Sequence, residues 1–233
     1  MILSIVMPAH NEEENIGDSI AKVESTVDIP HELIVVNDHS NDATAEIVKG
    51  MMKKYPSVRL INNAAAPGFV NALKAGFALA QTQLVVPVMG DLCDDLPTIK
   101  NMLKKIEEGY DVVCGSRYIS GGKRNGGSKL KAFLSRAAGR SLYHILGIPT
   151  HDIANAFKMY KKEILDRITV EAKGFEISME LPLKAYYMGY KITEVPTVWK
   201  ERTKGASSFK VFRLLPSYIK FYLWAVFNKF KAR

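Results

Sequence analysis

Three carboxylates are gathered in one short segment near the middle of the chain. The segment Asp91-Leu92-Cys93-Asp94-Asp95 follows the apolar run Leu84–Met89, with Gly90 between them. Carboxylate oxygens are preferred ligands of Mg²⁺ and Mn²⁺, and such ions often bridge to substrate phosphates. One of Asp94 and Asp95 is expected to cap the helix that Pro97 opens, but this leaves Asp91 unexplained. The segment therefore predicts a Mg²⁺ or Mn²⁺ site with Asp91, Asp94 and Asp95 as candidate ligands.

Basic side chains are concentrated in two long blocks that contain no carboxylate. The first block runs from Val112 to His151 and the second from Arg202 to Arg233, in a chain of formal net charge +8. A solvated helix face would explain any single lysine, but it explains two such blocks less well. The blocks favour an anionic partner, which could be a phosphorylated molecule, a membrane surface or nucleic acid. Nucleic acid is not favoured, because no recognised binding motif and no aromatic–basic platform on a strand is present.

The elements expected to position these groups alternate between strand and helix in the first half of the chain. The five expected strands are Leu3–Met7, Leu33–Val36, Val58–Ile61, Leu84–Met89 and Val112–Cys114. Apolar residues at helical spacing lie between them, and Asn11 offers an N-cap to the first helix, with Glu12 in its first turn. Strands that are apolar throughout predict a mainly parallel sheet with helices on both faces.

The second half of the chain is less regular. The expected elements are a glycine-rich loop at Ser120–Ser128, a basic helix at Lys129–Leu146, a strand at Asn155–Tyr160, a helix at Glu176–Met188 and a strand at Lys191–Val198. The tail from Phe209 to Phe230 has aromatic and basic residues at helical spacing, interrupted by Pro216. Such a helix fits an anionic membrane surface, packing on the domain, or a homo-oligomer contact.

Polar clusters follow four of the expected strands. They are Pro8–Asn11, Asn37–Asp42, Asp91–Asp95 and Gly115–Tyr118. One polar loop after a strand is usually only a turn. In an open parallel sheet, however, ligands bind beyond the carboxyl ends of the strands, so four clusters at equivalent positions predict a binding rim.

Eight segments with recognisable patterns span nearly the whole chain in order. They are SIVMPAHNEEENI (4–16), ELIVVNDHSNDAT (32–44), GFVNALKAGF (68–77), VVPVMGDLCDD (85–95), DVVCGSRY (111–118), HDIANAFKMY (151–160), GYKITEVP (189–196) and ERTKGASSFK (201–210). The ordered set resembles the family-2 inverting glycosyltransferases, and most of all the dolichyl- and polyprenyl-phosphate mannosyl- and glucosyltransferases. Any one segment alone is weak.

The resemblance implies a fold, a domain layout and a donor site. The fold would be the GT-A-type α/β fold, with a glycosyltransferase catalytic domain at 1–208 and a basic amphipathic helix at 209–233. The donor would be a GDP- or UDP-sugar, and Asp91 would bind the metal on its diphosphate. The implied donor-binding residues are Pro8, Ala9, Asn11 and Glu12 around the nucleotide, Asp38 at the base or ribose, and Asp91.

The resemblance also implies an acceptor site and catalytic residues. Arg117, Lys131 and Arg202 would hold the phosphate of a polyprenyl phosphate lipid. Asp91 and Arg117 are therefore expected catalytic residues, and Asp152 is a third on the chemical grounds given below. The enzyme would work on the cytoplasmic face of the membrane as a peripheral protein, and no stretch of the sequence approaches the roughly 20 apolar residues of a membrane span.

Several positions depart from the family pattern. Met89 stands where the first carboxylate of an Asp-x-Asp pair is common, and Asn37 stands where an aspartate is frequent. The glycine-rich turn before Ala72 is reduced to Pro67-Gly68. Lys131 replaces a frequent arginine, which keeps the charge but loses the bidentate fork. Metal dependence and substrate choice are affected by these changes more than the fold.

Two acceptor classes remain open on chemical grounds. A phosphate monoester needs no general base, because its second pKa is about 6 and it is mostly a dianion at neutral pH. A saccharide hydroxyl, as in surface polysaccharide synthesis, would need one, and Asp152 is then the best candidate. The other role for Asp152 is to order neighbouring basic side chains. A catalytically inactive homologue is a further alternative because of Met89.

Overall fold

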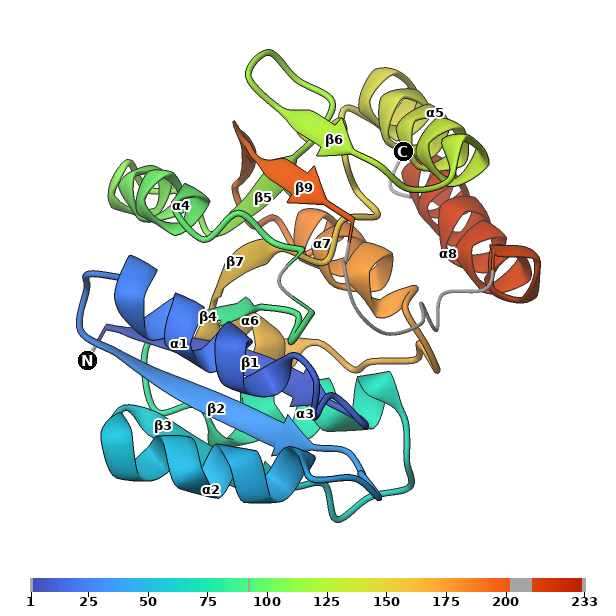
Figure 1. Ribbon diagram of the computed structural model, residues 1–233. Helices are drawn as coiled ribbons and strands as arrows, with labels where there is room; N and C mark the ends of the chain where they lie inside the picture. Colours follow the sequence, from blue (N-terminus) through green and yellow to red (C-terminus); the bar gives the residue numbers. More distant parts are fainter. Residues whose placement is uncertain (1, 92, 202–210, 232–233) are drawn as a thin grey trace.

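The computed structural model describes residues 2–91, 93–201 and 211–231, with the side chains of 211–213 and 230–231 excepted. Within these residues, seven strands form one sheet in the order β3-β2-β1-β4-β7-β5-β8 (Figure 1). The strands are β1 (Leu3–Ala9), β2 (His31–Asn37), β3 (Val58–Asn62), β4 (Leu84–Pro87), β5 (Val112–Ser116), β7 (Lys158–Lys161) and β8 (Ile192–Pro196). Only β7 is antiparallel to its neighbours β4 and β5. The predicted mainly parallel sheet is confirmed.

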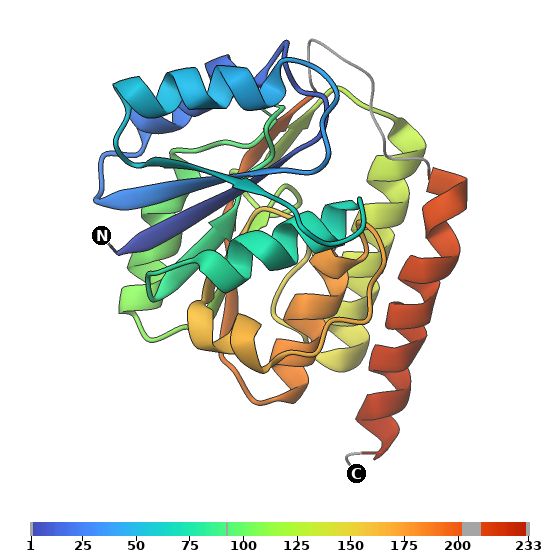
Figure 2. The same ribbon diagram turned by 90° about the horizontal axis from the view of Figure 1, so that it is seen from below.

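Helices cover both faces of this sheet, as the apolar strands predict (Figure 2). The helices α1 (Ile16–Thr26), α2 (Thr44–Lys54) and α4 (Thr98–Glu107) cover one face, and α3 (Phe69–Leu79), α5 (Lys129–Leu146), α6 (Lys162–Arg167), α7 (Ile177–Tyr187) and α8 (Val211–Lys231) lie on the other. Side chains alternate along each strand. Ile5 therefore packs in the core beneath α1, α2 and α4, and Val6 packs in the core on the opposite face.

A small second sheet is separate from the seven-stranded one. It pairs β6 (Lys123–Asn125) with β9 (Val198–Lys200) in parallel. The segment predicted as a loop at 120–128 therefore contains a strand, and the strand predicted at 191–198 is divided into β8 and β9. The Arg124 guanidinium stacks over the Trp199 ring at 4.7 Å, a tertiary contact that local sequence could not predict.

The first helix begins later than the sequence predicts. Asn11 has a positive φ of 52°, and α1 starts only at Ile16 after the cap residue Asn15. The reason is that residues 11–13 bind the neighbouring loop instead of capping their own helix. The Asn11 N–H donates to Ser40 Oγ (3.0 Å), and the Glu12 N–H donates to Thr44 Oγ1 (2.9 Å).

The C-terminal helix is continuous through Pro216, although the sequence predicted an interruption there. Proline removes only one N–H from the backbone ladder, and packing can compensate for that loss. Phe221 and Ala225 of α8 are buried, and the Tyr187 hydroxyl of α7 donates to the Ala225 carbonyl (2.5 Å). The Tyr222 hydroxyl is also hydrogen-bonded to Ser141 Oγ of α5 (3.0 Å), so the tail packs against two helices of the domain.

Candidate active site

The loops after β1, β2 and β4 meet at one edge of the sheet. Ala9 lies opposite Asn37 in the register of β1 and β2, and the Asp38 N–H donates to the Ala9 carbonyl (2.8 Å). On the other side of β1, the Val88 N–H donates to the Val6 carbonyl (2.9 Å). Three of the four predicted polar clusters therefore follow neighbouring strands at one edge of the sheet. Ala9 is buried beneath it, whereas Pro8 is half-buried and Asn11 is exposed.

Asp38 organises the loop that precedes α3. It is only 5% exposed, and its two carboxylate oxygens accept hydrogen bonds from Asn63 Nδ2 (2.7 Å) and from the Gly68 N–H (2.8 Å). Gly68 has a φ of 152°, which residues other than glycine rarely adopt. Sequence reasoning missed Asn63, although its position directly after β3 could have indicated it.

The three carboxylates of the 91–95 segment have different partners. Asp94 Oδ2 accepts from the Met89 N–H (3.0 Å), and Asp91 Oδ1 accepts from the Cys93 N–H (3.2 Å). Asp95 Oδ2 instead accepts from Thr98 Oγ1 (2.8 Å) at the start of α4. Asp95 therefore binds a side chain of α4 and not a backbone N–H, and the residue at the cap position of α4 is Pro97. The prediction that Asp94 or Asp95 caps this helix is wrong, because Asp94 instead accepts from the Met89 N–H.

The carboxylates fit a divalent ion as a pair better than as a trio. Across 2–91, 93–201 and 211–231, no three Asp, Glu, His or Cys side chains are placed to hold one ion. Burial, together with the nearby charges of Asp91 and Asp95, raises the pKa of Asp94 to about 7. A cation would relieve that repulsion. Because Mg²⁺ commonly takes one or two protein carboxylates plus substrate phosphates, Asp91 and Asp94 suit an ion shared with a diphosphate.

Arg117 follows β5 and is fixed by Asp152. Its Nε and Nη2 donate to Asp152 Oδ2 (2.7 Å) and Oδ1 (2.8 Å), and its backbone N–H donates to Oδ2 (3.0 Å). The Asp152 charge and these bonds raise the pKa of Arg117, although burial acts in the opposite direction. Asp152 is fully buried, with both oxygens bound to Arg117. This geometry matches the ordering role for Asp152, one of the two that the sequence left open.

A buried lysine supports the loop that carries Asp152. Lys158 lies in β7 with no exposed surface, and its ammonium group donates to the carbonyls of Ile153, Asn155 and Ser178. Burial lowers the pKa of Lys158 to about 8. Sequence reasoning did not select Lys158, although a lysine inside an apolar expected strand is a signal that could have found it.

Lys131 lies in the first turn of α5, near a residue of the same helix that contacts Arg117. Ser135, one turn further on, accepts a hydrogen bond at its hydroxyl from Arg117 Nη2 (3.3 Å). Residues four apart share a helix face, so Lys131 is on the side of α5 that faces Arg117. Arg202, the third predicted acceptor residue, lies outside the described residues.

Comparison with known proteins now identifies the family. Residues 4–169 match the sequence profile of Glycosyl transferase family 2. The chain belongs to this family. It is 30% identical over 215 residues to the dolichol-phosphate mannosyltransferase of Pyrococcus furiosus. The matched region covers 90% of this chain but only 60% of that protein. It is 25% identical over 229 residues to the polyprenol monophosphomannose synthase of Mycolicibacterium smegmatis, covering 95% and 86% of the two chains.

Solved structures support the GT-A-like fold of this glycosyltransferase. Glucosyl-3-phosphoglycerate synthase from Mycobacterium tuberculosis matches with a TM-score of 0.71 at 19% identity, over 97% of this chain and 80% of that one. That crystal holds Mn²⁺, UDP and glucosyl-3-phosphoglycerate. A second crystal of the same enzyme, with Mg²⁺ and UDP, matches with a TM-score of 0.70 at 19% identity, over 97% and 79% of the two chains.

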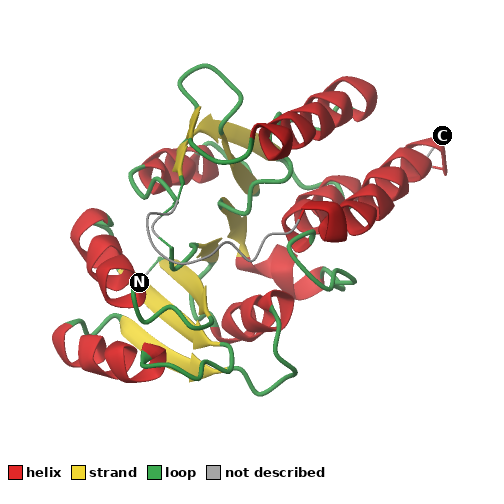
Figure 3. Cartoon of the chain, turned by 45° about the vertical axis from the view of Figure 1, so that its right-hand side comes forward, coloured by secondary structure: helices red, strands yellow, loops and turns green. Residues whose placement is uncertain are grey.

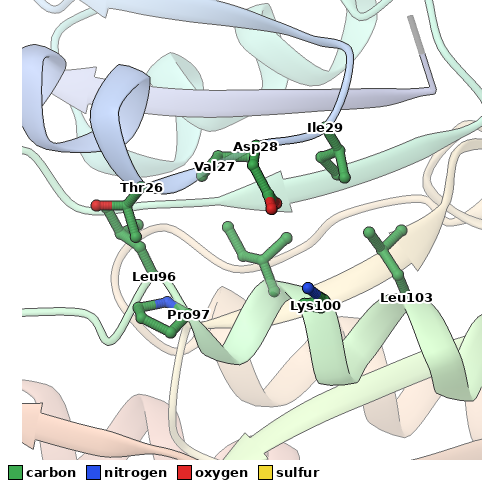
Figure 4. Close-up of a pocket in the computed structure, with 9 residues that line it drawn as sticks. Thr26, Val27, Asp28, Ile29, Leu96, Pro97, Lys100 and Leu103 are labelled. Carbon is green, nitrogen blue, oxygen red and sulfur yellow. The ribbon is translucent and has the colours of Figure 1, made fainter.

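A separate cavity of the glycosyltransferase lies between the end of α1 and α4. It has a volume of about 120 Å³ and is bordered by Thr26, Asp28, Pro97 and Lys100, among others (Figure 4). None of the predicted donor, acceptor or metal residues lines it. The cavity therefore has no part in the candidate active site.

Proposed function

We propose that this glycosyltransferase moves a hexosyl group, with inversion, from a GDP- or UDP-sugar to a polyprenyl phosphate at the membrane surface. The observation that carries the proposal is Arg117, a cation oriented by Asp152 at the end of β5 and beside the basic helix α5. Charge-assisted hydrogen bonds make such a group suited to a phosphate. The names of the two relatives support a polyprenyl phosphate acceptor and a mannosyl group.

The donor is proposed to lie along the rim of β1, β2 and β4. The nucleoside would contact the loops at Pro8–Glu12 and Asp38, with the diphosphate toward Asp91. A divalent ion at Asp91 and Asp94, when bound, would neutralise charge on the leaving diphosphate. The Mn²⁺ and Mg²⁺ complexes of the Mycobacterium tuberculosis enzyme support this assignment at the level of the fold.

The acceptor chemistry favours a phosphate over a hydroxyl. A general base must have an oxygen available to take a proton from the acceptor, whereas both oxygens of Asp152 bind Arg117. A phosphate dianion needs only to be held and aimed at the sugar carbon. Arg117 and Lys131, together with Arg202, are proposed to do this. Transfer to a saccharide hydroxyl remains the alternative, but no observation favours it.

The proposed contact with the membrane lies on two helices. α5 and α8 run side by side (Figure 2), joined by the Tyr222–Ser141 hydrogen bond. Both helices carry exposed apolar side chains, and we use the name α5–α8 face for the following set: Leu130, Phe133, Ile219, Leu223 and Phe227. Both helices lie in blocks without carboxylates, which suits the anionic cytoplasmic leaflet. No described helix has the length and apolar character needed to span a bilayer.

The catalytic domain at 1–208 and the helix at 209–233 are therefore proposed to act together. Transfer of radiolabelled sugar from a panel of GDP- and UDP-sugars into membrane lipid extract tests the function. Label is expected in an organic-soluble product that requires polyprenyl phosphate. Label that enters only water-soluble glycan, in the presence or absence of the lipid, would contradict the proposal and favour the saccharide acceptor.

A further inference from the structure

A buried carboxylate oxygen just before α7 lacks a partner. Glu176 is 3% exposed, and its Oε1 accepts from the N–H groups of Lys173 (2.9 Å) and Gly174 (3.1 Å). Among the described residues, no group donates a hydrogen bond to its Oε2. A buried acceptor without a donor is costly and uncommon in native proteins. This oxygen therefore indicates a hydrogen-bond donor that binds here.

The residues beside Glu176 in the chain contact both the nucleotide side and the acceptor side of the proposed site. On one side, the neighbouring Phe175 ring stacks on Phe69 with ring centres 4.5 Å apart, and Phe69 follows Gly68, which binds Asp38. On the other side, the Ser178 hydroxyl donates to the Ala154 carbonyl (3.1 Å), two residues after Asp152. The start of α7, where Glu176 lies, thus contacts both halves of the proposed site.

The C-terminal helix also contributes a side chain to this region. Burial raises the pKa of Tyr218 on α8, whose hydroxyl is hydrogen-bonded to Ser178 and lies within reach of the charges of Glu176 and Arg117. Glu176, Tyr218 and Arg117 therefore come from three separate elements to one region. In the proposed reaction, the sugar must occupy the space between the diphosphate and the acceptor phosphate that Arg117 holds.

We infer that Glu176 Oε2 accepts hydrogen bonds from hydroxyl groups of the hexosyl part of the donor, which makes Glu176 a residue that selects the sugar. This inference rests on the proposed function. A carboxylate repels phosphates, so the diphosphate and the acceptor phosphate are poor occupants of this position. Sugar hydroxyls are neutral donors, and they match an acceptor that already uses its other oxygen within the protein.

The substitution Glu176→Gln isolates this role. The amide oxygen of glutamine can still accept from the Lys173 and Gly174 N–H groups, and only Oε2 is replaced by a donor. Calorimetry would measure binding of GDP, GDP-mannose, UDP and UDP-glucose to the full chain. For the nucleotide that the wild type binds, E176Q should bind the nucleoside diphosphate normally. It should bind the nucleotide sugar about tenfold more weakly, the loss expected for a hydrogen bond to a charged group.

A matched control is Glu171→Gln, which makes the same chemical change at an exposed carboxylate five residues earlier in the chain. E171Q should keep both affinities. The melting midpoint of ligand-free E176Q should stay near that of the wild type, because the amide oxygen keeps the two backbone hydrogen bonds of Oε1.

Three results would overturn the inference. One is E176Q binding the nucleotide sugar as tightly as the wild type. A second is a lower melting midpoint with equal losses for nucleotide and nucleotide sugar, as expected if Glu176 is a structural partner for a cation of the chain, for example in residues 202–210. The third is an equal loss in E171Q. If the wild type binds none of the four compounds, the proposed function itself fails.

Discussion

Arg117 and Asp152 are joined by three hydrogen bonds across 35 residues of sequence. The two bonds from the guanidinium group are bidentate, which fixes its orientation as well as its position. Arg117 Nη1 takes no part in them. One edge of the guanidinium is thus held by Asp152, and Nη1 is the nitrogen that we propose binds the acceptor phosphate.

The first prediction is that Arg117→Ala impairs use of the acceptor and not of the donor. Losing one charge-assisted contact to phosphate removes about 1.5–3 kcal/mol, so the apparent KM for polyprenyl phosphate should rise about tenfold to a hundredfold. The KM for the nucleotide sugar should stay near the wild-type value. Arg167→Ala is the control, because Arg167 is exposed on α6 and away from the rim. Unchanged lipid kinetics in R117A would exclude Arg117 as the phosphate ligand.

The second prediction separates two roles of Asp152. If Asp152 acts only through Arg117, Asp152→Asn should weaken acceptor use in the wild type but add little in the R117A background. A double-mutant cycle on kcat/KM for the lipid measures this coupling. Losses that simply add in the double variant would show an independent role for Asp152, as a general base would have.

The third prediction distinguishes the carboxylates of the 91–95 segment. Asp91→Asn should reduce Mn²⁺-dependent binding of the nucleoside diphosphate and lower turnover strongly, because it removes a charge that faces the ion. Asp95→Asn should leave metal-dependent binding intact and at most weaken the hydrogen bond from Thr98 Oγ1, at a cost of about 1 kcal/mol. Calorimetry with Mn²⁺ and nucleotide, with excess chelator as a reference, checks both. Full activity of D91N, or of the wild type in chelator, contradicts the proposed metal role.

The sheet, the rim and several rim residues could be predicted from sequence because they depend on local patterns. Apolar strands followed by polar clusters specify where a parallel sheet binds ligands, and Arg117 stands at such a strand end. The pattern does not say which distant group each residue meets. Asp152 could therefore be a base or a partner of Arg117 until the fold brought the two side chains together.

The missed residues have partners that only the tertiary structure supplies. Lys158 binds two carbonyls of the 153–155 loop and one of α7, and Glu176 accepts hydrogen bonds from the N–H groups of Lys173 and Gly174. Asn11 was expected to cap a helix, but its side chain instead accepts a hydrogen bond from the Asn41 N–H (2.9 Å) on the adjacent loop. Local capping preference was outweighed by a contact across 30 residues, which a single sequence cannot reveal.

The fourth prediction concerns stability and pH. The buried Glu32 carboxylate has a lowered pKa. Burial alone would raise it, but hydrogen bonds from Ser4, the Gln81 N–H and Arg59 outweigh that effect. The stabilisation is therefore complete above the ordinary pKa of 4.5 and is lost as the pH falls through the lower native value.

Glu32→Gln should accordingly lower the free energy of unfolding by about 1.5–3 kcal/mol at pH 7, and the difference should shrink at pH 3. Urea unfolding at the two pH values measures it. Glu46→Gln, at an exposed carboxylate of α2, should change little at either pH. A deficit in E32Q that is the same at both pH values would show that charge is not the cause.

The last prediction concerns the α5–α8 face. Phe133 on α5 is 68% exposed and Phe227 on α8 is 62% exposed, and each side chain would gain about 1.5–3 kcal/mol by leaving water for the lipid interface. Phe133→Glu and Phe227→Glu should therefore each weaken binding to vesicles containing phosphatidylglycerol at least tenfold, while binding of the nucleotide is unchanged. Added salt should weaken the wild-type interaction as well, because the basic residues contribute to it.

Co-sedimentation with vesicles of pure phosphatidylcholine, and of phosphatidylcholine mixed with phosphatidylglycerol, provides the measurement. Met52→Glu is the matched control, since Met52 is an exposed apolar residue of α2 on the other face of the sheet. Figure 3 shows α8 extending along the side of the molecule away from the N-terminal strands. α5 and α8 lie on the opposite face of the sheet from α2. A general effect of added charge would therefore appear in M52E too. Equal losses in all three variants, or full binding by F133E and F227E, would exclude the α5–α8 face as the membrane contact.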